Sequence, residues 1–189
     1  MEIVVGISGA SGAIYGIRLL QVLEDYVTHL IITNSARKII ELETEFRIKE
    51  IEELADYVYD PFDFTAPISS GSFKFDAMTI VPCSMGTLAA IASGTSDTLI
   101  TRSADVCLKE KRKIIMVTRE TPLSLVQLKN MVSVVEAGGI ILPACPAFYS
   151  RPVNIDELVD VLVGRVLDQL RIENNLFKRW GERGNAYNR

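Results

Sequence analysis

The fold is decided by the stretch Gly6-Ile7-Ser8-Gly9-Ala10-Ser11-Gly12-Ala13, which follows the apolar run Ile3-Val4-Val5. Leucines and a valine then recur at helical spacing over residues 17–24, so the sequence predicts a strand, a turn of small residues and a helix. We expect the hydroxyls of Ser8 and Ser11 to face the helix N-terminus, where glycines let a ligand approach the main chain. Such a turn suits a phosphate, although a turn packed only for steric reasons has the same pattern.

A second turn of this kind follows the predicted strand at residues 77–82. Residues 83–87, Cys-Ser-Met-Gly-Thr, lead into a helical segment at 88–92. Two strand ends that carry hydroxyls and glycine before a helix indicate a phosphate or cofactor site more strongly than one does. Arg119 and Glu120 follow another predicted strand, at 113–118, and they extend this candidate site unless they form only a surface ion pair.

Strands and helices alternate along the rest of the chain. Further strands are predicted at 28–33 and 140–143, and helices at 35–43 with Ser35 as cap, 48–56, 97–111, 123–137 with Pro122 near its start, and 154–170. Residues 59–73 contain four aromatic residues and are expected to form an ordered loop near the site, unless they serve packing alone. The pattern predicts a single-domain, three-layer α/β/α doubly wound parallel sheet of the Rossmann or flavodoxin type.

Composition excludes several classes of function. The 189 residues are 48% hydrophobic and 23% charged, with a net charge of −4, so no general basic field would attract nucleic acid. No apolar run reaches the roughly 20 residues of a membrane span, and we expect a cytoplasmic protein. Three widely spaced cysteines and one histidine, His29, argue against a disulfide framework, a histidine metal site or a Ser-His triad. Buried thiols are expected instead.

Five segments together resemble the flavin prenyltransferase family of UbiX type: residues 6–13, 82–88, 97–106, 119–123 and 146–149. The resemblance covers nearly the whole chain, with the motifs in the same order. It implies a metal-independent transferase that joins a dimethylallyl group from dimethylallyl phosphate to N5 and then C6 of reduced FMN. The product, prenylated FMN, would serve as the cofactor of UbiD-type decarboxylases.

The resemblance also assigns site residues by position. The implied FMN contacts are Gly9, Ala10, Ser11, Thr33, Ser84, Met85, Gly86, Thr87 and Arg119. The implied prenyl phosphate ligands are Arg102, Lys109, Tyr149 and Arg165, and the implied catalytic residues are Ser11, Glu43, Glu120 and Trp180. Glu120 would protonate the leaving phosphate, while Ser11 and Glu43 would steer protons at N5 and C6. Trp180 lies in a tail, residues 171–189, that would close over the site.

Two other functions stay open: a flavin-dependent decarboxylase, and an FMN-carrying accessory subunit of a decarboxylase. The related cysteine decarboxylases use an essential histidine, and His29 is not at a comparable position. The apolar surplus suits subunit packing, and the resemblance implies a large homo-oligomer, with a dodecamer among its forms. Its sites would lie between subunits, so Arg102, Lys109 and Arg165 could serve a neighbour's site. The sequence does not decide between dimethylallyl phosphate and the diphosphate.

Overall fold

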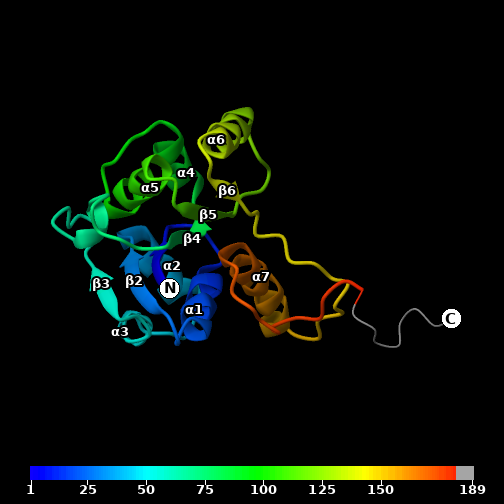
Figure 1. Cartoon of the computed structure of the whole chain (residues 1–189). Helices are drawn as coiled ribbons and strands as arrows, with labels where there is room; N and C mark the ends of the chain where they lie inside the picture. Colours follow the sequence, from blue (N-terminus) through cyan, green and yellow to red (C-terminus); the bar gives the residue numbers. More distant parts are fainter. Residues whose placement is uncertain (182–189) are drawn as a thin grey trace. The chain divides into compact units, whose positions relative to one another are not determined.

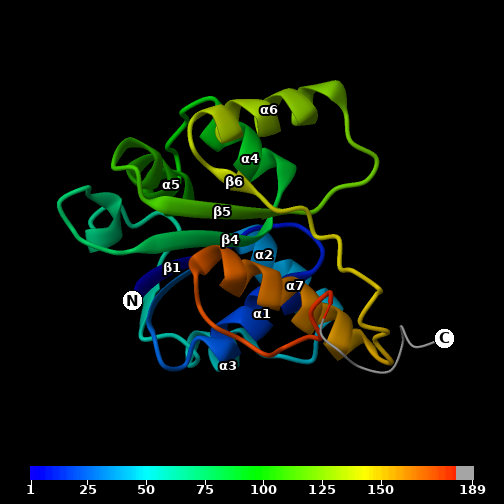
Figure 2. The same cartoon turned by 45° about the vertical axis from the view of Figure 1, so that its right-hand side comes forward.

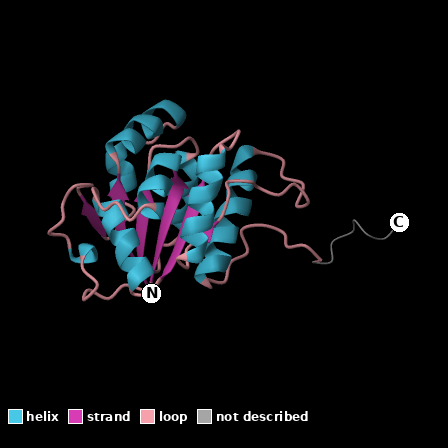
Figure 3. Ribbon diagram, turned by 90° about the horizontal axis from the view of Figure 1, so that it is seen from above, coloured by secondary structure: helices cyan, strands magenta, loops and turns pink. Residues whose placement is uncertain are grey.

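The computed structural model describes residues 1–181. Its central element is a six-stranded sheet in the order β3-β2-β1-β4-β5-β6, with every neighbouring pair parallel. The strands are β1 (Glu2–Ile7), β2 (Val27–Ile32), β3 (Tyr57–Tyr59), β4 (Ala77–Cys83), β5 (Lys113–Thr118) and β6 (Ile140–Ile141). Because the strand order reverses between β1 and β4, the predicted doubly wound sheet is confirmed. Figure 3 shows the strands of this sheet in magenta among the helices.

Helices cover both faces of this sheet (Figures 1 and 2). One face carries α1 (Ala13–Val22), α2 (Asn34–Glu43) and α3 (Ile48–Glu52), which connect β1, β2 and β3. The opposite face carries α4 (Met85–Ala92), α5 (Leu99–Lys109) and α6 (Leu125–Glu136), which connect β4, β5 and β6. This division follows from the two winding directions, because right-handed crossovers that leave a central strand in opposite directions lie on opposite faces.

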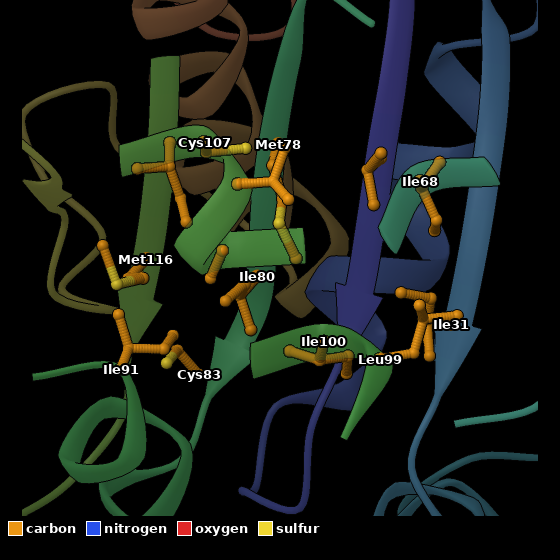
Figure 4. Packing of buried hydrophobic residues seen from close by; sticks show 14 of the residues in the cluster. Ile31, Ile68, Met78, Ile80, Cys83, Ile91, Leu99, Ile100, Cys107 and Met116 are labelled. Atoms are coloured by element: carbon orange, nitrogen blue, oxygen red, sulfur yellow. The ribbon is translucent and has the colours of Figure 1, made fainter. Parts of the chain in front are cut away.

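The main hydrophobic core fills the space between the sheet and the α4–α5 layer (Figure 4). All seven residues of β4 are buried, as a central parallel strand requires. Ile80 and Met116 on the strands pack with Ile91 and Ile100 on the helices in one cluster, and each such side chain contributes about 1.5–3 kcal/mol on burial. This packing fixes the positions of the turns that follow β1, β4 and β5.

Three local predictions are wrong. The helix predicted to residue 56 ends at Glu52, and the short edge strand β3 follows it. Thr33 rather than Ser35 caps α2, because its hydroxyl accepts the main-chain N–H of Ala36 (3.1 Å). Pro122 lies outside α6, whose cap is Ser124. In both helices a hydroxyl at the strand-to-helix turn satisfies an otherwise unpaired amide.

The chain divides into two compact units, Met1–Ala144 and Cys145–Arg189, and the second is described by itself. Its helix α7 (Ile155–Leu170) begins after Asn154, whose side chain accepts the N–H of Glu157 (2.8 Å). The following segment folds back along α7, and the ring of Phe177 occupies the space that a side chain at Gly164 would need. Residues 182–189 of the predicted tail lie outside the described residues, and closure of this tail over the site stays a prediction.

Among the described residues, no helix combines the length and the apolar character that crossing a membrane requires.

Candidate active site

Three helices begin at the carboxyl edge of the sheet, directly after β1, β2 and β4. The first amides of a helix have no partner inside it, and the helix dipole adds partial positive charge there. Thr33 caps α2, and Ser84 caps α4 by accepting the N–H of Thr87 (3.2 Å). The turn with Gly9 and Ser11 lies between these two ends, because β1 lies between β2 and β4. The structure therefore brings the predicted FMN contacts to one edge.

The end of α4 has the space and charge that a phosphate group needs. Apart from its chain neighbours and the backbone of its own helix, a Cβ added at Gly86 would find only Ser84 Oγ, 3.9 Å away, within 4 Å among residues 1–181. The main-chain N–H of Arg119 donates to the Cys83 carbonyl beside this turn (3.4 Å). The buried Nε of Arg119 has no hydrogen-bond partner among residues 1–181. An open helix N-terminus, next to a residue whose guanidinium keeps an N–H available, fits the phosphate of FMN.

The start of α1 already holds an anion. Its N-cap, Gly12, adopts a left-handed conformation (φ 98°) and has no side chain to cap the helix. The Glu43 carboxylate, at the end of α2, accepts the N–H groups of Gly12 (2.8 Å) and Ala13 (3.3 Å) instead. A phosphate at this turn, as the sequence suggested, would meet that carboxylate. The N-terminal ends of α2 and α4 are therefore the better candidates for a phosphate, and Glu43 contacts the residue that follows Ser11.

Ser8 has a different environment from the one predicted. It is buried, and its hydroxyl contacts Pro82 and Ser84 at the other turn rather than the N-terminus of α1. Sequence reasoning noticed this hydroxyl but assigned it to the wrong helix. The partners lie more than 70 positions away in the sequence, so only the pairing of β1 with β4 reveals the contact.

Arg119 and Glu120 lie at the carboxyl end of β5, as predicted. Glu120 is exposed, and its Oε1 accepts the N–H of Thr121 (3.0 Å). Since β5 pairs with β4, this carboxyl group lies on the same edge of the sheet as the open end of α4. A ligand bound there would therefore lie on the edge of the sheet that carries Glu120.

The two residues of α5 that are predicted to bind the prenyl phosphate, Arg102 and Lys109, lie near opposite ends of the helix. Arg102, in the first turns, donates to the Ser69 carbonyl (2.9 Å) and to Asp105 (2.7 Å). Lys109 ends α5 shortly before β5 begins, so it lies near the amino edge, where it donates to Glu110 (2.9 Å). Six strand residues span about 17 Å. Within this unit the structure therefore does not bring Lys109 to the turns after β1 and β4, which carry the predicted FMN contacts (the FMN turns).

The aromatic loop at residues 59–73 starts at the carboxyl edge but packs mainly along α5. The N–H of Leu99 donates to the Pro61 carbonyl (2.7 Å), and the Ser103 hydroxyl donates to the Ile68 carbonyl (3.2 Å). Farther along, Arg112 donates to the Gly71 carbonyl (2.7 Å) at the amino edge. These contacts favour the packing explanation for most of this loop.

The second unit gathers the remaining predicted residues. The rings of Tyr149 and Trp180 meet edge to face, with centroids 5.4 Å apart. Arg165 donates to Asp168 (2.7 Å), and two nitrogens of Arg179 donate to the same carboxylate (3.0 and 2.8 Å). The hydrogen bond from Arg179 is the main reason why the pKa of Asp168 lies below its ordinary value. Sequence analysis missed Asp168, although it lies three positions after Arg165, a spacing typical of helical ion pairs.

The single histidine lies away from the turns at the carboxyl edge of the sheet. His29 is buried inside β2, where Nε2 contacts Glu2 Oε1 (2.7 Å) and Nδ1 contacts the Tyr59 hydroxyl (2.9 Å).

Cys83 is the last residue of β4, directly before the turn that leads into α4. Burial raises the pKa of its thiol to about 12. Cys83 therefore stays protonated at neutral pH and does not supply a thiolate nucleophile.

Of the three cysteines, Cys83 and Cys107 are buried as predicted, but Cys145 is exposed. No cluster of three or more His, Cys, Asp or Glu side chains within residues 1–181 is arranged to hold a metal ion.

Comparison with known proteins extends these observations. The sequence profile described as Flavoprotein matches residues 1–167. A flavin prenyltransferase UbiX of Thermoplasma acidophilum is 52% identical over 180 residues, which are 95% of this chain and 100% of that protein. The crystal structure of AnUbiX (PadA1) in complex with FMN and dimethylallyl pyrophosphate superimposes with a TM-score of 0.95 at 46% identity, covering 97% of this chain and 98% of that one. A dodecameric FMN-dependent UbiX-like decarboxylase from Escherichia coli O157:H7 has a TM-score of 0.93 at 45% identity, covering 95% and 99%.

Proposed function

Because the chain belongs to the UbiX-type flavin prenyltransferase family, we propose that its site joins a dimethylallyl group to N5 and C6 of reduced FMN. The observation that carries this proposal is the open N-terminus of α4 beside the main chain of Arg119, whose buried Nε has no hydrogen-bond partner among residues 1–181. It lies at the point where the strand order reverses, which is where doubly wound sheets bind nucleotides. The relative AnUbiX, crystallised with FMN and dimethylallyl pyrophosphate, supports the same assignment.

The FMN phosphate is held by the first amides of α4 and by Arg119. The hydroxyls of Ser84 and Thr87 share one hydrogen bond (3.0 Å), which leaves one O–H to donate at that end, and the Thr33 hydroxyl lies at the start of α2. The main chain at Gly9 and Ala10 runs along the flavin. When bound, reduced FMN supplies the electron-rich N5 and C6 atoms that accept the dimethylallyl group.

Proton transfer is carried out by Glu120, Glu43 and Ser11, which lie at the carboxyl edge of the sheet. Glu120 protonates the phosphate as it leaves, because an allylic phosphate departs only when its growing negative charge is neutralised. Two main-chain N–H groups, of Gly12 and Ala13, hold Glu43 at the turn that contains Ser11. With Ser11 as a relay, Glu43 would accept the proton lost when N5 is alkylated and deliver a proton to the prenyl double bond, whose other carbon then bonds to C6. The proton lost from C6 would return to Glu43.

The prenyl phosphate is bound by Arg102, Lys109, Tyr149 and Arg165. The cationic side chains of Arg102, Lys109 and Arg165 bind the negatively charged phosphate. The aromatic faces of Tyr149 and Trp180 stabilise an allyl cation by about 1 kcal/mol or more. The segment from residue 171 closes over the site with Trp180 and excludes water. The edge-to-face pair of Tyr149 and Trp180 holds these two aromatic residues together within the second unit.

The protein acts as a homo-oligomer whose sites lie between subunits. Two observations support this: the 45% identical E. coli protein is dodecameric, and α6 exposes an apolar stripe. The stripe is formed by Leu125, Leu128, Val132 and Val135, which are 44–67% exposed. Its spacing of three, four and three residues is that of helices that pack on a partner helix. Lys109, distant from the FMN turns of its own unit, then serves a neighbouring subunit.

The proposed transfer is tested by anaerobic incubation with reduced FMN and dimethylallyl phosphate, followed by mass spectrometry of the extracted flavin. We expect a mass gain of one isoprene unit. A parallel incubation with dimethylallyl diphosphate decides which donor is used. Unchanged flavin with both donors, in a protein that still binds FMN, would contradict prenyl transfer and favour an FMN carrier. Adding an aromatic acid and measuring released CO₂ tests decarboxylase activity directly.

Shared sites are tested by mixing two inactive variants. Lys109→Ala and Glu120→Gln chains are unfolded, mixed in equal amounts and refolded together. If each site takes Lys109 and Glu120 from different chains, about one quarter of the sites in randomly mixed oligomers have both native residues. Each variant refolded alone is the control. Mixed oligomers as inactive as both controls would contradict sites shared in this way.

The product, prenylated FMN, is passed to a UbiD-type decarboxylase in the cytoplasm. The absence of a disulfide among three cysteines is consistent with that reducing compartment. Adding reaction product to a purified apo-decarboxylase of this type, with untreated FMN as the control, should restore decarboxylation only with the product.

A further inference from the structure

Ser8 joins the two turns that carry the proposed FMN contacts. The residue is only 1% exposed. Its hydroxyl donates to the Pro82 carbonyl (3.0 Å) and accepts the main-chain N–H of Ser84 (2.8 Å). The N–H of Ser8 donates to the same Pro82 carbonyl (3.2 Å). One residue therefore connects the turn after β1 with the turn after β4.

This connection lies just beyond the regularly paired residues of the two strands. The register of β1 and β4 runs from Ile3 opposite Ala77 to Gly6 opposite Ile80. Beyond it, Pro82 has no N–H with which to continue the ladder. A hydroxyl suits this position because it can donate and accept at the same time. An alanine at position 8 would leave the Ser84 N–H without this acceptor.

We propose that Ser8 is a positioning residue for FMN binding. Ser84 is the N-cap of α4, so a shift of its main chain moves the amides of Met85 and Gly86 with it. By holding Ser84, Ser8 sets the distance between the turn at Gly9 and the first turn of α4. This inference rests on the proposed function, because it takes both turns as FMN contacts.

The test compares Ser8→Ala with Ser103→Ala in the full-length protein. Ser103 is a matched control: it is fully buried, and its hydroxyl also donates to a carbonyl, that of Ile68 in the loop that packs along α5. FMN affinity is measured by quenching of flavin fluorescence, stability by the unfolding midpoint without FMN, and turnover by kcat and KM. We expect Ser8→Ala to raise Kd and KM for FMN about tenfold, with kcat at saturating FMN nearly unchanged. Ser103→Ala should leave Kd unchanged.

Two results would overturn the inference: wild-type FMN affinity in Ser8→Ala, or an equal loss of affinity in Ser103→Ala. If Ser8→Ala does not fold, Ser8→Cys is measured in the same way, since a thiol has similar size but is a weak hydrogen-bonding group. We expect reduced affinity there too, and wild-type affinity would count against Ser8. A wild-type protein that binds no FMN would instead contradict the proposed function, so the two failures are distinguishable.

Discussion

The Glu43 carboxylate lies 2.8 Å from the main-chain nitrogen of Gly12, and it caps a helix that has no cap of its own. Negative charge at a helix N-terminus is stabilising, so Glu43 contributes to folding as well as to the proposed proton transfer. The two roles need different properties of the side chain. Capping needs an oxygen that accepts hydrogen bonds, whereas proton transfer needs a group that gains and loses a proton.

Substitution of Glu43 separates these roles. Glu43→Ala should lower the free energy of unfolding by about 1 kcal/mol, as loss of a helix cap does, and Glu43→Gln by less, because the amide keeps one acceptor oxygen. Both should lower the rate of flavin prenylation about 100-fold. Urea unfolding and timed mass spectrometry measure the two effects. Glu41→Gln, on the exposed side of α2, is the control, and native prenylation by Glu43→Gln would exclude Glu43 from proton transfer.

Glu120→Gln should affect chemistry but not flavin binding. The amide cannot protonate a leaving phosphate, so kcat should fall about 100-fold or more. Glu120 is exposed and accepts a hydrogen bond from the main-chain N–H of the neighbouring Thr121, so the Kd for FMN should stay the same. Kinetics and flavin fluorescence measure both quantities, with Glu136→Gln at the end of α6 as the control. A variant with full kcat would remove Glu120 from the scheme.

Local signals in the sequence were sufficient for most of the fold. Apolar strands, small-residue turns and helical spacing alternate clearly, and they placed Gly9, Ser84 and Arg119 at strand ends on one edge of the sheet. The edge strand β3 was missed because Tyr57–Tyr59 is too short to show an alternating pattern. Its position is determined by pairing with β2, which is a tertiary contact.

Sequence reasoning assigned the polar partners of the site less well. Glu43 follows Gly12 by 31 positions, and Ser84 follows Ser8 by 76. Which polar group meets which helix end depends on strand order and on the crossing of α1 and α2, and no local spacing encodes these. The family resemblance named Glu43 as a site residue, but only the structure shows that it occupies the helix end first expected to hold a phosphate.

The apolar stripe on α6 predicts how the oligomer can be weakened. Val132→Asp places a charge in the middle of the stripe, where burial against another subunit would be costly. We expect a smaller assembly by light scattering at the same protein concentration. Ser133→Asp is the matched control, because it adds the same charge one position away on the exposed helix. An unchanged mass for Val132→Asp would show that the stripe lies outside the subunit contacts.

Thiol reactivity should differ sharply among the three cysteines. Burial raises the pKa of Cys83 and Cys107 to about 12, and the thiolate is the reactive form. Titration of the native protein with a disulfide reagent should therefore detect one thiol per chain, and titration in denaturant should detect all three. Cys145→Ser should abolish the native reaction. A second fast-reacting thiol in the native protein would contradict the packing of the sheet core.

Asp168 should make the stability of the second unit depend on acid pH. Hydrogen bonds from Arg179 hold its pKa below the ordinary value of 3.8, so the folded state favours the charged carboxylate. The resulting stabilisation is complete above the pKa of Asp168 in the unfolded chain and is lost as pH falls through the lower pKa of the folded state.

Asp168→Asn should lower the free energy of unfolding by about 2 kcal/mol at neutral pH. The decline of this free energy below about pH 4 should be smaller in the variant than in the wild type. Urea unfolding across this pH range, with the exposed Glu173→Gln as the control, measures both effects. If Asp168→Asn keeps the wild-type pH profile, the ion pair with Arg179 does not hold the segment after α7 in place.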